Sequence, residues 1–301
     1  MVTSKDVQQI VSLLSSDKAK CREEGVKLLS TWLDGERAIN FCHYLGRETE
    51  RIKPTEIPHS ESWPFLVSLL VQCVTSEVSS SKRRSPKISF AKSLRTAIQR
   101  AEDTKFSGRS LPLLPIVRTL FGHVWDILSN VSGFQTEYAV ILRVLLSSRD
   151  YRFHIRSRVY NNLAIFYFEK IQNIFPLGIS NQKEELFRCI LTLHSILENP
   201  PGDFNDECRG ICVEGFVNIF SSLREESKIS RKLIECVNTF LLKDGPNLGT
   251  KYIEIHVAMW HFTFHVWNST HDRGLKEILY TYANIQLNLV RGTSQDDCLV
   301  D

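Results

Sequence analysis

Apolar residues recur every three or four positions along nearly the whole chain, and this spacing constrains the fold more than any other feature. It places apolar side chains on one face of an α-helix, and that face must pack against a neighbouring element. No run of residues shows the strict alternation of a half-buried strand. We therefore predict an all-α protein. Clear examples are Phe65, Leu66, Leu69, Leu70 and Cys73, then Val117, Leu120, Phe121, Val124 and Leu128, and later Leu233, Val237, Phe240 and Leu241.

Proline and glycine separate the helical segments, as at Lys53–Pro58, Asn199–Phe204 and Gly245-Pro246. Proline lacks a backbone N–H and biases the residue before it to extended conformations, so a helix does not run through these points. The intervals predict roughly a dozen helices, with a helix pair about every 40 residues, which is typical of HEAT-like solenoids. We predict an α-solenoid over residues 1–291. Because no exact sequence repeat is visible, an irregular helical bundle remains the alternative.

Two polar segments depart from the helical pattern. Residues 76–88 are serine-rich and basic, and we expect an exposed, mobile loop there. Residues 292–301 are mostly polar and end on Cys298–Asp301, which resembles the first turn of another helix. A finished solenoid ends in a polar capping repeat, so we expect the chain to be a fragment or a truncated product.

Charge and hydropathy argue against several classes of protein. A net charge of +3 is too small to attract nucleic acid by itself, so DNA binding would require a local basic patch. The residues after Met1 lack the apolar core of a secretory signal, and the apolar runs are shorter than the ~18 residues of a membrane helix. We expect a soluble intracellular protein that has no membrane contact.

The sequence contains no recognisable catalytic motif: no glycine-rich phosphate loop, GxSxG elbow, HExxH motif or kinase catalytic loop. The eight cysteines are scattered without a CxxC pair, which is typical of buried reduced thiols. His261 and His265 are four residues apart, with His256 nearby, but aromatic residues surround them and no acid lies between them. We expect partly buried packing histidines, and we predict no catalytic residue, metal site or cofactor in this chain.

Two basic clusters are candidate contact sites. Lys82, Arg83 and Arg84 form a short tract that is a candidate nuclear import signal, and phosphorylation of Ser85 would offset its charge. Arg149, Arg152 and Arg156 would share one face of a helix that covered all three, where they could contact a DNA backbone or an acidic peptide. Solvated arginines paired with neighbouring acids are the alternative.

A third candidate lies in residues 14–29, which we interpret as part of the second helix. Lys18 and Arg22 are four residues apart and would project together beside an apolar stripe. A solvated, salt-bridged face involving Glu23 and Glu24 is the alternative. We expect the stripe to contain Cys21, Gly25, Leu28, Leu29 and Trp32.

This segment resembles the TAN motif at the N-terminus of ATM-type checkpoint kinases. Leu14, Lys18, Arg22 and Val26 fit that motif, whereas Cys21 stands where the motif has an acid, so a salt bridge made by that acid cannot be carried over. Similarity to plant ATM homologues extends along essentially all 301 residues, including Trp63–Leu66, Gln99–Phe106, Ile127–Asn130, Cys189–Ser195, Glu198–Phe204 and Arg231–Asn247.

The resemblance implies a nuclear serine/threonine kinase of the phosphatidylinositol-kinase-like group that acts in double-strand-break signalling, DNA repair and telomere-length maintenance. It also implies that this region is a non-catalytic helical spiral, since the family's kinase domain, with its ATP and Mg sites, lies at the far C-terminus. Leu14, Lys18, Arg22 and Val26 would form the partner-binding motif, and the partners would be proteins of the break-sensing machinery that present acidic peptides. Direct DNA-backbone binding and a purely structural spacer remain the alternatives.

Overall fold

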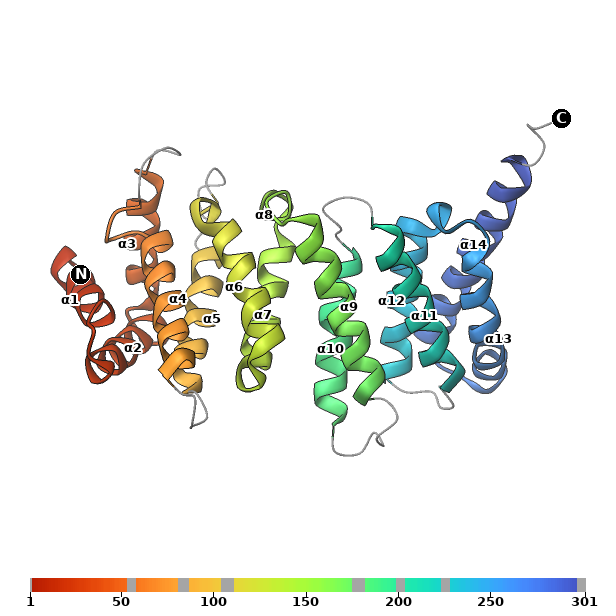
Figure 1. The fold of residues 1–301 in the computed structure, drawn as a ribbon, viewed down its shortest axis with the longest axis horizontal. Coiled ribbons are helices and arrows are strands. Elements are labelled where there is room, and N and C mark those ends of the chain that lie inside the picture. Colours follow the sequence, from red (N-terminus) through yellow and green to blue (C-terminus); the bar gives the residue numbers. More distant parts are fainter. Residues whose placement is uncertain are drawn as a thin grey trace. The chain divides into compact units, whose positions relative to one another are not determined.

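The computed structural model describes residues 2–52, 58–80, 87–103, 111–174, 182–198, 204–222 and 228–296. Within these ranges all regular structure is helical, with fourteen α-helices, three short 3-10 helices and no strand. The prediction of an all-α, solenoid-like fold is confirmed, with slightly more helices than the sequence suggested. The chain divides into two compact units, Met1–Ile155 and Arg156–Asp301 (Figure 1).

The first unit contains eight of the α-helices, and α5 lies at its centre. Helix α5 packs against α2, α4 and α7, while α1 packs against both α2 and α4. The buried Thr49 helps to start α4, because its Oγ1 accepts a hydrogen bond of 3.0 Å from the Trp63 backbone N–H. The helices are α1 (Ser4–Leu14), α2 (Ala19–Asp34), α3 (Ala38–Glu50), α4 (Trp63–Ser80), α5 (Ile88–Asp103), α6 (Val117–Asn130), α7 (Gln135–Ser147) and α8 (Arg149–Arg152), with 3-10 turns η1 (Leu114–Ile116) and η2 (Ser132–Phe134).

The second unit consists of two layers of helices. Helices α9, α11 and α13 pack side by side in one layer, and α10, α12 and α14 in the other. The first layer's helices begin at Ser157, Asp206 and Tyr252, so the pair recurs every 46–49 residues, a little longer than the sequence predicted. The helices are α9 (Ser157–Ile174), α10 (Lys183–Glu198), α11 (Asp206–Ser222), α12 (Lys228–Asp244), α13 (Tyr252–Ser269) and α14 (Arg273–Asp296), with the 3-10 segment η4 (Gly245–Lys251).

Buried aromatic rings and a buried ion pair hold the helices of the second unit together. Phe168 of α9 meets Phe216 of α11 edge-on at 4.9 Å between ring centroids, and Phe216 meets Phe240 of α12 at 5.7 Å. At the end of α12, Arg209 Nε donates to Asp244 Oδ2 at 2.8 Å, and the Asp244 side chain is almost fully buried. Because this carboxylate is taken out of water, losing the arginine that pairs with it would leave an uncompensated buried charge, which is destabilising.

Two boundary predictions need correction. Residues 76–80 of the segment expected to be a loop belong to α4, which continues to Ser80, and Ile88 is the first residue of α5. The polar segment expected to start at residue 292 begins inside α14, which runs to Asp296. Residues 81–86 and 297–301 lie outside the described part of the chain. In the described ranges, no helix combines the length and the apolar character that crossing a bilayer requires.

Candidate functional site

The hairpin of α1 and α2 carries all four residues of the candidate binding motif, and two of them are core residues. Leu14, the last residue of α1, and Val26 in α2 are both buried. Gly25 lets the two helices approach closely, since a Cβ atom there would lie 3.0 Å from Leu13 Cβ and 3.1 Å from Leu14 Cδ2. Leu14 and Val26 therefore hold the hairpin together and present no free apolar surface.

Arg22 stabilises the turn between the two helices. Its Nη1 donates to the backbone carbonyl oxygens of Ser16, at 2.9 Å, and Asp17, at 2.8 Å. These carbonyls follow the C-terminus of α1, where the helix dipole also favours a positive charge. The guanidinium is thus engaged by the chain's own backbone.

Lys18 is the exposed cation of the motif. It is the N-cap residue of α2 with extended backbone angles, and its carbonyl oxygen accepts a helical hydrogen bond of 3.2 Å from the Arg22 backbone N–H. The Arg22 side chain turns back to the carbonyls of Ser16 and Asp17, whereas Lys18 is exposed. Lys18 lies at the positive end of a 16-residue helix whose first turn holds no acid. This end of α2 can attract a carboxylate or a phosphate.

The apolar face of α2 is shifted from its predicted position. Gly25 and Leu29 are buried as expected, together with Val26 and Leu33. Cys21, Leu28 and Trp32 are only half-buried. Helix α2 packs against both α1 and α5. The position of α5, as well as that of α1, therefore determines which side chains of α2 are buried.

A carboxylate that the sequence did not single out fixes the position of this hairpin. Glu61, just before α4, accepts hydrogen bonds from the Ser4 and Tyr44 hydroxyls and, at 3.2 Å, from Gln8 Nε2. The bonds from Ser4 and Tyr44 lower the pKa of Glu61, and burial beside this carboxylate raises the pKa of Tyr44 to about 12. Glu61 therefore joins α1 to α3 and to the start of α4.

The arginine cluster is not a single helical face. Helix α8 ends at Arg152, so it includes Arg149 and Arg152 but not Arg156, which belongs to the second unit. Arg152 Nη1 donates to the Leu146 carbonyl at 2.6 Å, and the Arg149 guanidinium lies 5.7 Å from the ring centroid of Phe153. The predicted shared face is wrong because the chain turns after Arg152.

The basic tract Lys82, Arg83 and Arg84 lies outside the described residues. Next to it, Lys87 forms an ion pair with Glu23 of α2, and its backbone N–H donates to Glu77 Oε1 at 3.1 Å. Glu23 thus pairs with the residue that precedes α5, and not with a cation of α2 as the salt-bridged alternative assumed.

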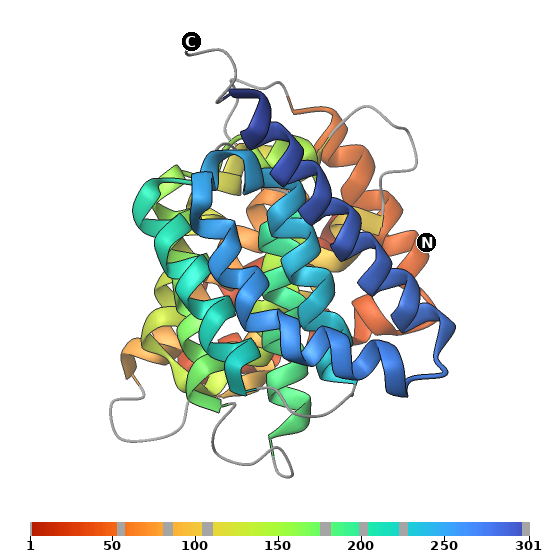
Figure 2. The ribbon, with the colours of Figure 1, turned by 90° about the vertical axis from the view of Figure 1, so that its right-hand side faces the viewer.

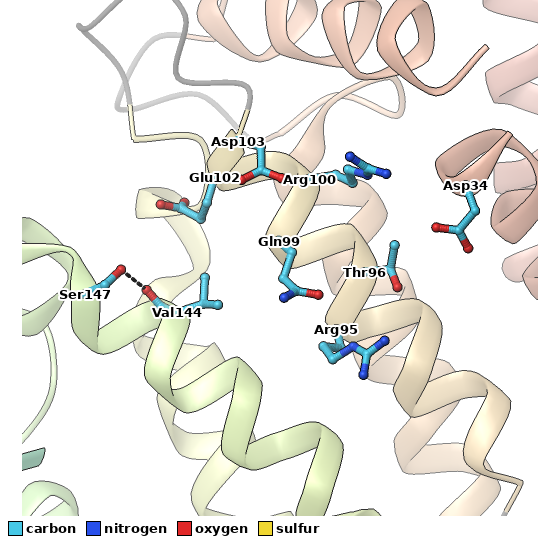
Figure 3. Close-up of a pocket in the computed structure, with 9 residues that line it drawn as sticks. All are labelled: Asp34, Arg95, Thr96, Gln99, Arg100, Glu102, Asp103, Val144 and Ser147. Atoms are coloured by element: carbon cyan, nitrogen blue, oxygen red, sulfur yellow. Dashed lines mark hydrogen bonds between the residues drawn. The ribbon is translucent and has the colours of Figure 1, made fainter. Parts of the chain in front are cut away.

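A polar cavity of about 450 Å³ opens in the first unit (Figure 3). Its lining combines charges of both signs and contains no histidine or cysteine. Two of its lining residues have partners: Arg95 Nη1 lies 2.7 Å from Glu137 Oε2, a buried carboxylate, and Glu102 accepts a hydrogen bond of 2.5 Å from the Tyr151 hydroxyl. The lining residues are Asp34 of α2, Arg95, Thr96, Gln99, Arg100, Glu102 and Asp103 of α5, and Val144 and Ser147 of α7.

Buried histidine and cysteine side chains serve packing. His256 stacks on Tyr282 at 6.1 Å between centroids, and burial lowers its pKa, whereas His265 is exposed and does not fit the packing role expected for it. Cys208 and Cys212 are fully buried free thiols, as expected for cysteines that form no CxxC pair. Across the described ranges no three potential metal ligands come together.

The sequence is 54% identical to the serine/threonine-protein kinase ATM of Arabidopsis thaliana, and the match covers 96% of this chain. The chain spans only 8% of that protein's length. No family model matches the sequence, and no solved structure matches it.

Proposed function

We propose that this chain, which is an ATM-family region, is a non-catalytic docking segment in double-strand-break signalling, DNA repair and telomere-length maintenance, and that it acts in the nucleus. The observation that carries the proposal is its 54% identity to the plant kinase over nearly all of its own length. A two-layered helical array supports it, because such arrays offer extended surfaces on which other proteins bind. Catalysis, with ATP and Mg, is assigned to other parts of the longer kinase.

Lys18 is the residue we assign to the partner. It combines an exposed ammonium group with the positive end of α2, and the two together favour an acidic peptide. Leu14, Arg22 and Val26 act through Lys18, since they hold the hairpin that presents it.

A second candidate function is that of a structural spacer. It is favoured by one specific observation: three of the four motif residues are engaged in packing or in holding a turn of their own hairpin. A spacer requires the hairpin to fold but does not require Lys18 to be positive.

Charge reversal at Lys18 separates the two functions. In a plant whose gene for this protein carries Lys18→Glu, docking predicts weakened break-induced phosphorylation and shortened telomeres, while the protein stays at its normal abundance. Lys27→Glu is the matched control, because Lys27 is an exposed lysine in α2, the helix that Lys18 precedes. Normal signalling in the Lys18→Glu plant would favour the spacer.

A further inference from the structure

Two surfaces of the chain have no role in the proposed function. The first is the side of α13 that carries Val257, Trp260 and Phe264, which are exposed, whereas Ile255 and Met259 on its other side are buried. Figure 2 looks onto α13 and α14. Because the hydrophobic effect is non-directional, these apolar side chains do not select a ligand. The second surface is the polar cavity of the first unit, whose charges do.

The cavity lies at the C-terminal ends of three helices. Helix α5 supplies most of its lining, and α2 and α7, which both pack on α5, supply the rest. In Figure 3, Asp34 of α2 lies on one side of α5, and Val144 and Ser147 of α7 lie on the other. The polar side of α5, opposite its buried side, thus forms the floor of the cavity. It carries Arg95, Thr96, Gln99, Arg100 and Asp103.

The helix ends make the cavity electronegative. Asp34 is the last residue of α2, Asp103 is the last of α5 and Ser147 is the last of α7. The last carbonyl groups of a helix lack partners within the helix and form the negative end of its dipole, so an acid there does not stabilise the helix. Negative helix ends and carboxylates that meet in one cavity together favour a positively charged ligand.

The charges of the lining do not balance. The lining contains three acids and two arginines. One of the arginines, Arg95, is already paired, because its Nη1 lies 2.7 Å from Oε2 of the buried Glu137. In the part of the chain that the structure describes, Asp34 and Asp103 form no ion pair. A positively charged ligand would supply the partner that these two carboxylates lack.

Two uncharged side chains of α5 identify the kind of ligand. Thr96 and Gln99 are half-buried, and within the described ranges their side chains make no hydrogen bond. A hydroxyl and an amide offer donors and acceptors, which match the N–H and C=O groups of a peptide backbone. The volume of about 450 Å³ is that of a ligand pocket, and no three potential metal ligands come together in the described residues. A basic peptide therefore fits these groups better than a metal ion does.

We propose that this cavity binds a short basic segment of a partner protein. Lysine or arginine side chains of the segment pair with Asp34 and Asp103, and its backbone forms hydrogen bonds with Thr96 and Gln99. This site is separate from the docking role proposed for Lys18, which has the opposite charge. Lys18 precedes α2 and Asp34 ends it, so the 16 residues of the helix place them about 24 Å apart.

The test uses the 301-residue chain and a fluorescein-labelled peptide of about eight residues in which lysine alternates with serine. The same peptide with every lysine acetylated is the control for charge. Binding is followed by fluorescence anisotropy at about 0.15 M salt, where contacts between distant exposed charges are screened. Hydrogen exchange of α5 then shows whether the peptide binds at the cavity.

Three variants separate the cavity from general charge attraction. Asp34→Asn combined with Asp103→Asn removes both unpaired carboxylates, and the fold should tolerate this change because an acid at a helix C-terminus is not stabilising. Gln99→Ala removes the amide. Asp126→Asn is the matched control, since Asp126 is an exposed aspartate on α6 of the same unit.

The expected result is saturable binding of the lysine peptide, but not of the acetylated one, with slower exchange in the C-terminal half of α5. The double aspartate variant should weaken binding about tenfold and Gln99→Ala about threefold, whereas Asp126→Asn should leave it unchanged. No binding, or an equal loss with Asp126→Asn, would overturn the proposal. It would also be overturned if spermine bound the same part of α5 as tightly as the peptide and Gln99→Ala had no effect, because the site would then take a small polyamine.

Discussion

Replacing Arg22 with alanine should destabilise the first unit, although Arg22 lies in a segment that resembles a binding motif. Its Nη1 makes two hydrogen bonds to the carbonyls of Ser16 and Asp17, at 2.9 and 2.8 Å. A hydrogen bond from a charged group contributes about 1.5–3 kcal/mol, and the bond to Asp17 is exposed, so we take a total of about 2 kcal/mol for the pair. Arg22→Lys should recover part of this, because lysine keeps the charge but lacks the guanidinium's forked donors.

The assay is hydrogen exchange of α1, together with urea unfolding followed by helical circular dichroism. Hydrogen exchange reports the local opening of the α1–α2 hairpin. Urea unfolding of a chain with two units can give one broad transition in which this local opening is not resolved. Lys18→Ala is the internal reference and should change stability by less than about 0.5 kcal/mol, as expected for an exposed side chain. The reasoning is refuted if Arg22→Ala costs less than about 0.5 kcal/mol, or if Lys18→Ala costs as much as Arg22→Ala.

Three further predictions concern other parts of the chain. Leu29→Ala should cost roughly 2–5 kcal/mol in urea unfolding because Leu29 is fully buried, whereas Leu28→Ala, at a half-buried site, should cost clearly less; equal costs would contradict the burial pattern of α2. The pKa of Glu61 is lower in the folded chain than in the unfolded chain, so its stabilising effect is present above about pH 4.3 and is lost as the pH falls through the folded-state pKa. Glu61→Gln should therefore flatten the acid limb of a pH–stability curve, and an unchanged limb would count against the carboxylate's role. Arg209→Leu should cost about 3 kcal/mol in the second unit, as it leaves buried Asp244 without its cation; a double variant that also carries Asp244→Leu should regain part of that loss.

Local sequence signals were sufficient to predict most helices. Gly245-Pro246 ends α12 at Asp244, and Asn199-Pro200 follows the end of α10 at Glu198, because these residues act on the backbone of their immediate neighbours. The break between Arg152 and Arg156 has no such marker. Arg149, Arg152 and Arg156 are spaced as on one side of a helix, but the helix ends at Arg152.

Contacts between distant residues could not be predicted. Glu61 is 57 residues from Ser4 and 17 from Tyr44, and nothing local indicates that the three side chains meet. The role of Arg22 could not be predicted for the same reason. Its spacing from Lys18 suggested a shared face, but the carbonyls that it binds become available only once the turn has formed. The two-sided character of α13 is visible in the sequence, yet only packing distinguishes its covered face from its exposed face.

The measurement that most directly tests the docking proposal is site-specific photo-crosslinking beside Lys18. A photoreactive amino acid replaces the exposed Ala19 in cells, so that Lys18 keeps its charge, strand breaks are induced, and the captured species is identified by mass spectrometry, with the same replacement at Lys27 as the reference. The proposal predicts a break-dependent crosslink at position 19, and not at 27, to a protein segment rich in acidic residues. Equal yields at both positions, or a crosslink to DNA alone, would contradict it.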